Sequence, residues 1–233
     1  MLGVQKGAGA IGRGVTAIDG PAGAGKSTVA KRVADSLGFT YVDTGAMYRG
    51  ITLLGMRAGI APSDSEEKLT ELVRSADLKF EAGSGEGLRV HLNGEDVTRA
   101  IREPDVSRQV SYYARIPSVR QVLTLLQREL AVAGGIVMEG RDIGTVVLPD
   151  ADHKFFVTAS PLERARRRLK ELNQEGYRLD LDRLVREIEE RDRIDSSRSL
   201  APLCVAPDAV VIDTTDLSVD EVVAMIVAKV GNT

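Results

Sequence analysis

Residues 20–27 hold the spacing Gly-x-x-x-x-Gly-Lys-Ser, which is typical of a loop that binds the phosphates of a nucleotide. Backbone N–H groups of such a turn converge on an anion, Lys26 can reach the β- and γ-phosphates, and the Ser27 hydroxyl can ligate Mg²⁺. The alternative is a glycine turn with a surface lysine, which the strand-like residues 15–19 before the loop disfavour. The residues expected to contact the triphosphate are Gly20, Pro21, Ala22, Gly23, Ala24, Gly25, Lys26, Ser27 and Thr28.

A second set of residues could clamp another phosphate near the end of a predicted helix. Arg191, Asp195 and Arg198 lie at i, i+4 and i+7, which places them on one face if the helix continues through residues 196–197. Guanidinium groups bind phosphate bidentately and stabilise the charge of a transferring phosphoryl group. A solvated helix face with ion pairs is the alternative. A segment of this size can act as a lid, and that favours the phosphate-binding interpretation.

Polar side chains also follow two other predicted strands where those strands end. Glu139 and Arg141 follow residues 136–138, and Thr44 and Arg49 follow residues 39–42. Because ligands of parallel sheets bind beyond the carboxyl ends of the strands, these residues belong beside the triphosphate. A carboxylate at the position of Glu139 usually holds Mg²⁺ through water, so Ser27 and Glu139 are the predicted metal ligands.

Two of the arginines keep a structural alternative. Arg141 could form a salt bridge with the adjacent Asp142 instead of meeting a ligand. Arg120 lies on the polar face of a helix predicted to begin at Pro117, where a solvent-exposed role is as plausible as a functional one.

The surrounding pattern predicts an α/β fold in which a P-loop NTPase-type parallel sheet is flanked by helices. Strand 15–19, the phosphate loop, a helix from Ser27 to a stop at Gly38, and strand 39–42 form its first βαβ unit. Short strands between residues 78 and 102, with Asn93-Gly94 as a hairpin turn, predict a small antiparallel insert. A lid region is expected over residues 160–200. Capping boxes are predicted at residues 63–66, 160–163 and 218–221.

Composition restricts the partners and the compartment. The chain has 233 residues, a net charge of −3 and 4% aromatic residues, which disfavours a nucleic-acid-binding ATPase. No apolar run approaches the roughly 18 residues of a membrane span. The single cysteine, Cys204, excludes an internal disulfide, suits the reducing cytoplasm and is expected to be buried. His91 and His153 lack metal-ligand spacing. Residues 1–14 are expected to form a flexible leader before a kinase domain over residues 15–233.

Four motifs occur in order along the chain, and together they resemble the bacterial cytidylate (CMP/dCMP) kinases, which are nucleoside monophosphate kinases. The motifs are Gly-Pro-Ala-Gly-Ala-Gly-Lys-Ser, Asp-Thr-Gly-Ala-Met-Tyr-Arg, Glu-Gly-Arg-Asp-Ile-Gly-Thr-Val-Val and Glu-Arg-Asp-Arg-Ile-Asp-Ser-Ser-Arg. The resemblance covers residues 15–230. It implies that the γ-phosphoryl group of ATP is transferred to CMP or dCMP with Mg²⁺ as cofactor, in the cytoplasm, as part of pyrimidine metabolism. It also implies that residues 78–102 form a CMP-binding subdomain, and we expect a monomer.

The resemblance assigns roles residue by residue. The CMP phosphate would be bound by Thr44, Arg49, Arg141 and Arg198, the cytosine by Ser111, Arg120 and Asp142, and the ribose by Arg191 and Asp195. Catalytic charge stabilisation would come from Lys26, Arg141, Arg191 and Arg198, and ATP would also be contacted by Arg164 and Arg167. Two residues depart from the pattern of many relatives, which carry serine at Thr44 and aspartate at Glu139. Both changes keep the functional group, so we expect tuned activity and not its loss.

Other functions of the same loop are weaker interpretations. A GTPase switch needs an Asn-Lys-x-Asp signature, and the chain has none. A kinase for another small acceptor, such as UMP, is the nearer rival. The Asp142 carboxylate disfavours it, because it can accept a hydrogen bond from the exocyclic amine that cytosine has and uracil lacks.

Overall fold

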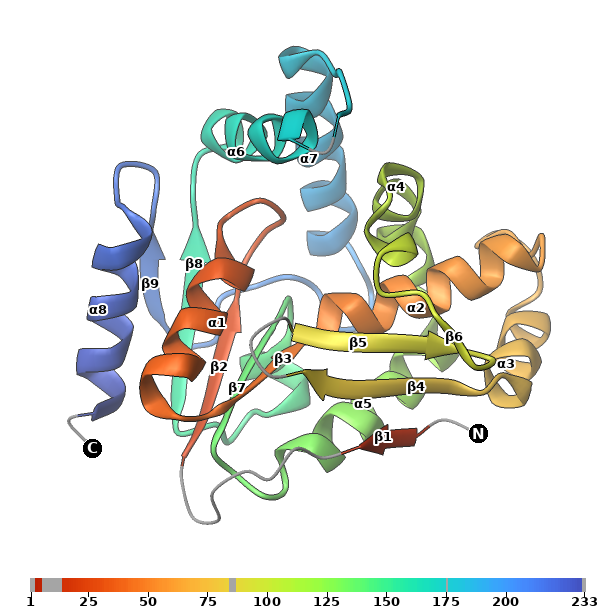
Figure 1. Cartoon of the computed structure of the whole chain (residues 1–233), viewed down its shortest axis with the longest axis horizontal. Helices are drawn as coiled ribbons and strands as arrows, with labels where there is room; N and C mark the ends of the chain where they lie inside the picture. The colour runs from red at the N-terminus through yellow and green to blue at the C-terminus, as the bar shows by residue number, and fades with distance from the viewer. Residues whose placement is uncertain (1–2, 6–13, 84–86, 175, 232–233) are drawn as a thin grey trace.

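The computed structural model describes residues 3–5, 14–83, 87–174 and 176–231, which form a parallel sheet between two layers of helices (Figure 1). The sheet has the strand order β3-β7-β2-β8-β9. All of its pairings are parallel. Its strands are β2 (Val15–Asp19), β3 (Thr40–Asp43), β7 (Ile136–Gly140), β8 (His153–Thr158) and β9 (Val210–Asp213).

Alternating side chains divide the interior between the two faces of this sheet. Ala17 and Met138 join a core with helices α2 (Thr44–Arg57) and α5 (Pro117–Ala131). Their neighbours Ile18 and Val137 face α1 (Lys26–Leu37) and α8 (Val219–Gly231) on the other side. Both faces of these central strands are buried, so their apolar residues follow one another without polar alternation until the charged residues Asp19 and Glu139 near the carboxyl ends.

The first βαβ unit forms as predicted, and its glycines explain how the loop closes. A Cβ atom on Gly20 would lie 1.9 Å from the carbonyl oxygen of Val157, so β8 leaves no room for a side chain there. Gly25 caps α1 with φ of 84°, a left-handed conformation that favours glycine. At the other end of α1 the N–H of Gly38 bonds to the carbonyls of Ala34 and Asp35, which ends the helix.

A small second sheet has the order β1-β4-β5-β6 and confirms the antiparallel strands predicted between residues 78 and 102. Asn93 and Gly94, with φ of 50° and 84°, make the tight turn into β6. The strands are β1 (Gly3–Gln5), β4 (Leu78–Gly83), β5 (Gly87–Leu92) and β6 (Glu95–Asp96). Strand β1 lies in the expected flexible leader but pairs with β4. The rest of that leader, apart from Gly14, lies outside the described residues.

Several helices complete the molecule, and two features among them differ from expectation. The helix α4 (Pro104–Tyr113) and the π-helical turn Ile143–Val147 were not predicted. The other elements are α3 (Glu66–Ser75), the short 3₁₀ turn Ala100–Arg102, α6 (Pro161–Gln174) and α7 (Leu181–Ser196). Helices α6 and α7 stand above the sheet and share a small apolar cluster of their own. No helix within the described ranges is long and apolar enough to cross a membrane.

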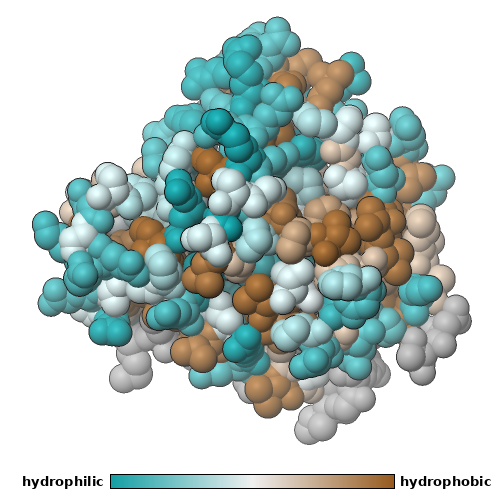
Figure 2. Space-filling view, turned by 180° about the vertical axis from the view of Figure 1, so that it is seen from behind, coloured by the Kyte–Doolittle hydropathy of each residue, from teal (hydrophilic) through white to brown (hydrophobic). Residues whose placement is uncertain are grey.

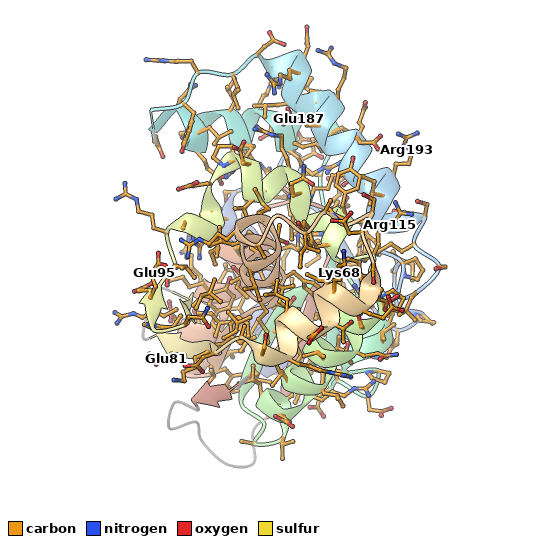
Figure 3. The ribbon with its side chains drawn as sticks, turned by 90° about the vertical axis from the view of Figure 1, so that its right-hand side faces the viewer. Lys68, Glu81, Glu95, Arg115, Glu187 and Arg193 are labelled. Carbon is orange, nitrogen blue, oxygen red and sulfur yellow. The ribbon has the colours of Figure 1, made fainter. Side chains whose placement is uncertain are left out.

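The surface carries most of the remaining charge. From behind, the upper part of the molecule is mainly hydrophilic (Figure 2). Labelled side chains such as Glu95 and Arg193 point outwards (Figure 3). Glu95 forms two hydrogen bonds with Arg57, of 2.7 and 3.0 Å.

Cys204 is exposed, so the expectation of a buried cysteine was wrong. It lies in the loop between α7 and β9, which has no regular packing face.

The three predicted capping boxes have different outcomes. At residues 218–221 both reciprocal bonds form, with Glu221 accepting from the Ser218 N–H at 2.8 Å and Ser218 Oγ accepting from the Glu221 N–H at 3.3 Å. At residues 160–163 only the bond from the Glu163 N–H to Ser160 Oγ is made. The box at residues 63–66 was wrong. Asp64 instead accepts from the Ala61 N–H, and the helix begins three residues later than Ser63.

Replacing Ser218 by alanine is expected to lower the free energy of unfolding by about 1 kcal/mol, because the N-terminus of α8 loses its side-chain acceptor. Urea denaturation of both proteins measures this difference. Ser65→Ala is the matched control, since the Ser65 side chain makes no capping bond to α3. An equal decrease in the free energy of unfolding for both variants would contradict the capping role assigned to Ser218.

Candidate active site

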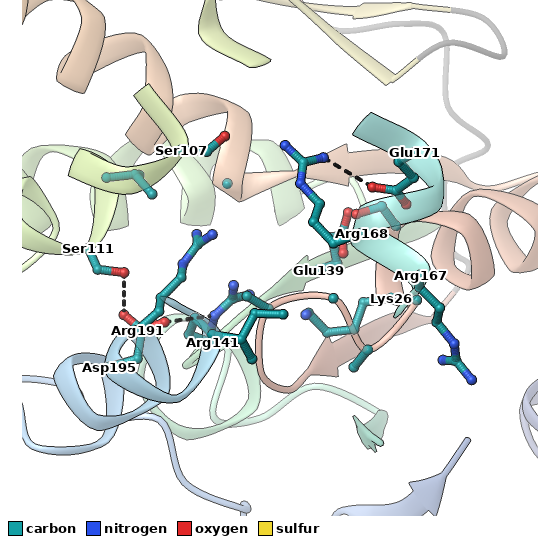
Figure 4. Close-up of a pocket in the computed structure, with 18 of the residues that line it drawn as sticks. Lys26, Ser107, Ser111, Glu139, Arg141, Arg167, Arg168, Glu171, Arg191 and Asp195 are labelled. Carbon is teal, nitrogen blue, oxygen red and sulfur yellow. Dashed lines mark hydrogen bonds and ion pairs between the residues drawn. The ribbon is translucent and has the colours of Figure 1, made fainter. Parts of the chain in front are cut away.

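A cavity of about 1210 Å³ lies at the carboxyl edge of the main sheet, lined by residues of the phosphate loop, α2, α4, α5, α6 and α7. Figure 4 shows labelled side chains from the phosphate loop, α4, α6 and α7 around it, with Glu139 and Arg141 at the end of β7. It brings together nearly all the residues that the sequence indicates for both nucleotides. The predicted residues that line it are Ala22, Gly23, Ala24, Gly25, Lys26, Ser27, Thr28, Thr44, Arg49, Ser111, Arg120, Glu139, Arg141, Asp142, Arg167, Arg191, Asp195 and Arg198.

Lys26 occupies the donor end of the cavity in an almost completely buried position. Its Nζ donates to the carbonyl of Pro21 at 2.6 Å, which holds the side chain against its own loop. Burial and, to a smaller extent, the positive charge of Arg141 lower the pKa of Lys26 to about 7, while Glu139 opposes the shift. An anion bound in the loop would restore the ammonium form, because opposite charge raises the pKa of a lysine.

Ser27 and Glu139 present oxygen atoms to the same part of the cavity, and oxygen is the donor that Mg²⁺ prefers. The Ser27 hydroxyl is close enough to hydrogen-bond Glu139, which lowers the pKa of that carboxyl. Burial raises the same pKa more strongly, and so does the nearby Asp43 carboxylate. The Glu139 carboxylate also accepts from the Tyr41 hydroxyl. These residues therefore fit a hydrated magnesium ion.

Three arginines gather around one carboxylate at the middle of the cavity. Asp195 accepts from Arg141 Nε at 3.1 Å and from Ser111 Oγ at 3.0 Å (Figure 4). Burial acts to raise the pKa of Asp195, but the guanidinium groups of Arg141, Arg191 and Arg198 lower it overall. Burial and the charge of Arg141 lower the pKa of Arg191 to about 10. Positive charge thus exceeds negative charge here, as a site for phosphate requires.

Arg198 belongs to this cluster, but it does not lie on the helix as its spacing from Arg191 predicted. Helix α7 ends at Ser196, so Arg198 lies beyond it and the continuous helix was wrong. The bond from the Ser197 N–H to the Arg193 carbonyl completes the last helical turn, and Ser197 is the C-cap at which the chain leaves the helix. Arg198 Nε then donates to the carbonyl of Asp195 at 3.1 Å, which keeps the side chain buried beside the cavity.

Arg120 and Asp142 form an ion pair at the far wall of the acceptor side, and both are almost fully buried. A second nitrogen of Arg120 donates to the carbonyl of Ala114 at 3.2 Å, and its guanidinium carbon lies 5.4 Å from the centre of the Tyr48 ring. Burial acts to lower the pKa of Arg120, but Tyr48 and Asp142 raise it overall. Arg120, for which the sequence left a solvent-exposed role open, is therefore fixed with Asp142 in the cavity wall, and Arg141 pairs with Asp195 instead of Asp142.

Thr44 and Arg49, which follow β3, line the cavity and are held by bonds to the neighbouring strand β7 and to Asp43. Thr44 Oγ1 donates to the Glu139 carbonyl at 2.7 Å, and Arg49 pairs with Asp43 at 2.9 Å. The Nε of Arg49 has no hydrogen-bond partner within the described structure. The same holds for buried nitrogens of Arg191 and Arg198, so several buried donors of this site lack protein partners among the described residues.

Three predicted residues lie outside the cavity lining. Gly20 and Pro21 support the loop from behind, through contact with Val157 and with Lys26 respectively. Arg164 is 3% exposed and is bonded to carbonyl groups and to Asp192, so its position does not favour the predicted contact with ATP. In the same helix Arg167 does line the cavity, where it also bonds to Thr214.

Asp19 is a buried carboxylate that the sequence analysis did not single out, although a charged residue at the end of an apolar strand is a signal. It accepts from the N–H groups of Ile143 and Gly144 at 2.8 and 2.7 Å, directly after Asp142. Burial raises its pKa to about 6, while these backbone bonds oppose the shift. Asp19 thereby joins the strand that precedes the phosphate loop to the start of the π-helical turn, whose N-cap is Asp142.

Comparison with known proteins gives one consistent family. The sequence model described as "Cytidylate kinase" matches residues 16–232. The cytidylate kinase of Pelotomaculum thermopropionicum is 54% identical over 92% of this chain and 95% of its own length, and that of Desulforamulus reducens shows the same values. A bifunctional pantoate ligase/cytidylate kinase of Synechococcus elongatus is 52% identical over 92% of this chain and 41% of its own.

Among solved structures, an uncharacterized protein from Eubacterium ventriosum has a similar fold. Its TM-score is 0.51 at 12% identity, with coverage of 95% of this chain and 99% of that chain. This likeness supports the architecture alone.

Replacing Asp19 by asparagine is expected to remove a pH dependence of stability. Because the folded-state pKa is raised above the ordinary value of 3.8, folding binds a proton, and the stability it provides is lost as pH rises from about 4 to about 6. The free energy of unfolding of Asp19→Asn relative to wild type should therefore rise by up to about 3 kcal/mol across this range.

Urea denaturation at several pH values gives this difference for each protein. Asp35→Asn, an exposed site on α1, is the control and should show no such trend. Parallel pH profiles for wild type and Asp19→Asn would show that Asp19 does not titrate as the structure indicates.

Proposed function

The chain belongs to the cytidylate kinase family, and we propose that it transfers the γ-phosphoryl group of ATP to CMP or dCMP, giving ADP and CDP or dCDP. One observation carries this proposal: two sites suited to phosphates open into one cavity, with the buried pair Arg120 and Asp142 beyond the second. The phosphate loop with Lys26 is the donor site. The arginines around Asp195 are the acceptor site.

The reaction needs charge neutralisation more than proton transfer. An oxygen of the CMP phosphate attacks the γ-phosphorus of ATP, and the bond from that phosphorus to the β,γ-bridging oxygen breaks, so ADP leaves with the electron pair. A phosphate monoester is largely ionised near neutral pH, so no general base is required. Lys26 stabilises the donor phosphates, and Arg141, Arg191 and Arg198 stabilise the group in transfer.

Magnesium is the proposed cofactor, with Ser27 as a ligand and Glu139 holding it through water. When bound, the ion neutralises charge on the phosphate oxygens of ATP. The oxygen atoms of both residues, which line the same cavity within hydrogen-bond reach of each other, support this assignment.

Recognition of cytosine is assigned to Ser111, Arg120 and Asp142. A carboxylate accepts from the exocyclic amine of cytosine, whereas uracil offers a carbonyl oxygen at the same position. UMP would leave buried polar groups without partners, which is the strongest form of discrimination available to a binding site. Arg191 and Asp195 are assigned to the ribose, and Thr44 and Arg49 to the CMP phosphate together with Arg141 and Arg198.

The remaining assignments concern the whole protein. We propose a lid over residues 160–200, a cytoplasmic monomer and a role in pyrimidine nucleotide metabolism. For the insert at residues 78–102 we propose an indirect role, since Arg102 alone among its described residues lines the cavity. Its strands instead pack on α2, where Val90 lies against Gly50. Neither nucleic acid nor membrane is a proposed partner.

Replacing Arg141 by alanine is expected to lower kcat for CMP phosphorylation by about a thousandfold, because this guanidinium faces the phosphates and fixes Asp195. A coupled assay of ADP formation measures it. Arg193→Ala is the control, since that side chain points into solvent on α7 (Figure 3). Wild-type kinetics in Arg141→Ala would remove Arg141 from the site.

Wild-type protein is expected to use CMP and dCMP far better than UMP, with AMP and GMP tested in the same assay. Asp142→Asn should narrow the ratio of kcat/KM for CMP over UMP by about a hundredfold, because the acceptor of the exocyclic amine becomes an amide. Asp150→Asn, an exposed site in the same loop region, should keep the wild-type ratio. Equal use of UMP and CMP by wild type would refute the proposed substrate.

A further inference from the structure

Arg164 is a buried arginine that lies outside the cavity and yet joins three separate segments. Its Nε donates to the Ala159 carbonyl at 2.9 Å, directly after β8. One terminal nitrogen donates to the carbonyl of Ala22 in the phosphate loop at 3.0 Å. Both terminal nitrogens also reach the carboxylate of Asp192 on α7, at 3.2 and 2.6 Å. A lysine could not make this set, since it has a single nitrogen.

The first part of this link ties α6 to the phosphate loop. Besides the bond to Ala22, the backbone of Gly23 lies against Arg164, because a Cβ atom at Gly23 would be 3.1 Å from the Arg164 Cβ. Arg167, one turn further on, donates to the Thr214 carbonyl at 2.6 Å. The start of α6 is therefore fixed to the donor side of the cavity.

The bond between Arg164 and Asp192 connects α6 to α7 next to Arg191 and Asp195, the residues of α7 that line the cavity. Asp192 and Asp195 lie three positions apart, so they are neighbours on the helix surface. Asp195 bonds to Ser111 and Arg141 on the acceptor side. Asp192 bonds to Arg164 on the donor side. Arg191, which lines the cavity, directly precedes Asp192 along the helix.

Helices α6 and α7 also pack against each other through apolar side chains. Ala165 and Leu172 of α6 pack with Leu184 and Ile188 of α7 in a cluster separate from both main cores. Because packed cores resist continuous deformation, α6 and α7 move together, and the polar contacts at their base decide where Arg191 is held.

We propose that Arg164 and Asp192 form a positioning pair, which holds α7 against the phosphate loop so that Arg191 meets the phosphoryl group in transfer. Neither side chain of the pair touches a nucleotide. This inference rests on the proposed transfer from ATP to CMP and adds to it the residues that set the alignment of the lid helix with the donor loop. Misplacement of a catalytic group by about 1 Å costs on the order of a hundredfold in rate.

The test is the substitution Asp192→Asn, which keeps the shape of the side chain and removes its charge. Its kcat is expected to fall by about ten- to a hundredfold, while KM for ATP and for CMP stays within about threefold of wild type. Hydrolysis of ATP without CMP should rise relative to transfer, because a loosened lid admits water. Asp182→Asn, exposed in the first turn of the same helix, is the matched control.

Arg164→Lys gives the same readouts if Asp192→Asn fails to fold. In the double variant the losses should not add, since either change alone breaks the link. The proposal is overturned if Asp192→Asn has the kcat of Asp182→Asn, or if KM rises while kcat is unchanged, or if the two losses add in full. Failure of wild type to phosphorylate CMP would instead refute the proposed function.

Discussion

The repulsion among buried arginines is the constraint on which the site depends. Arg141, Arg191 and Arg198 enter one cavity from different segments, and Asp195 is the carboxylate that faces all three. Its pKa lies below the ordinary value despite burial, since the guanidinium groups favour its charged form. Without that charge the arginines would repel one another and move towards solvent.

The single negative charge of Asp195 does not neutralise the three arginines, and the excess positive charge favours the binding of anions. Burial and Arg141 lower the pKa of Lys26 to about 7 and that of Arg191 to about 10, so both groups release a proton more readily than they would in water. Phosphates bound there would supply the opposite charge that the protein lacks. The site holds positive groups close together at a cost in stability, which such anions would offset.

Local patterns were enough to predict part of this arrangement. The phosphate loop depends on glycine spacing, and Arg141 follows a strand whose end must face the ligand, so both could be predicted from sequence. The direction of Arg164 could not, because α6 carries four arginines with the same helix propensity and only tertiary contacts bury this one. The π-helical turn after Asp142 depends on bonds from Asp19, more than a hundred residues earlier.

Three carboxylates, those of Asp19, Asp192 and Asp195, each connect two segments that surround the cavity. Asp19 joins the donor strand to the loop that carries Arg141 and Asp142. Asp195 joins that loop to α7, and Asp192 joins α7 back to the phosphate loop through Arg164. Each acid is hydrogen-bonded by protein groups, so protein contacts hold the three segments together. The cations that remain can then act on phosphates whose relative placement the protein has already determined.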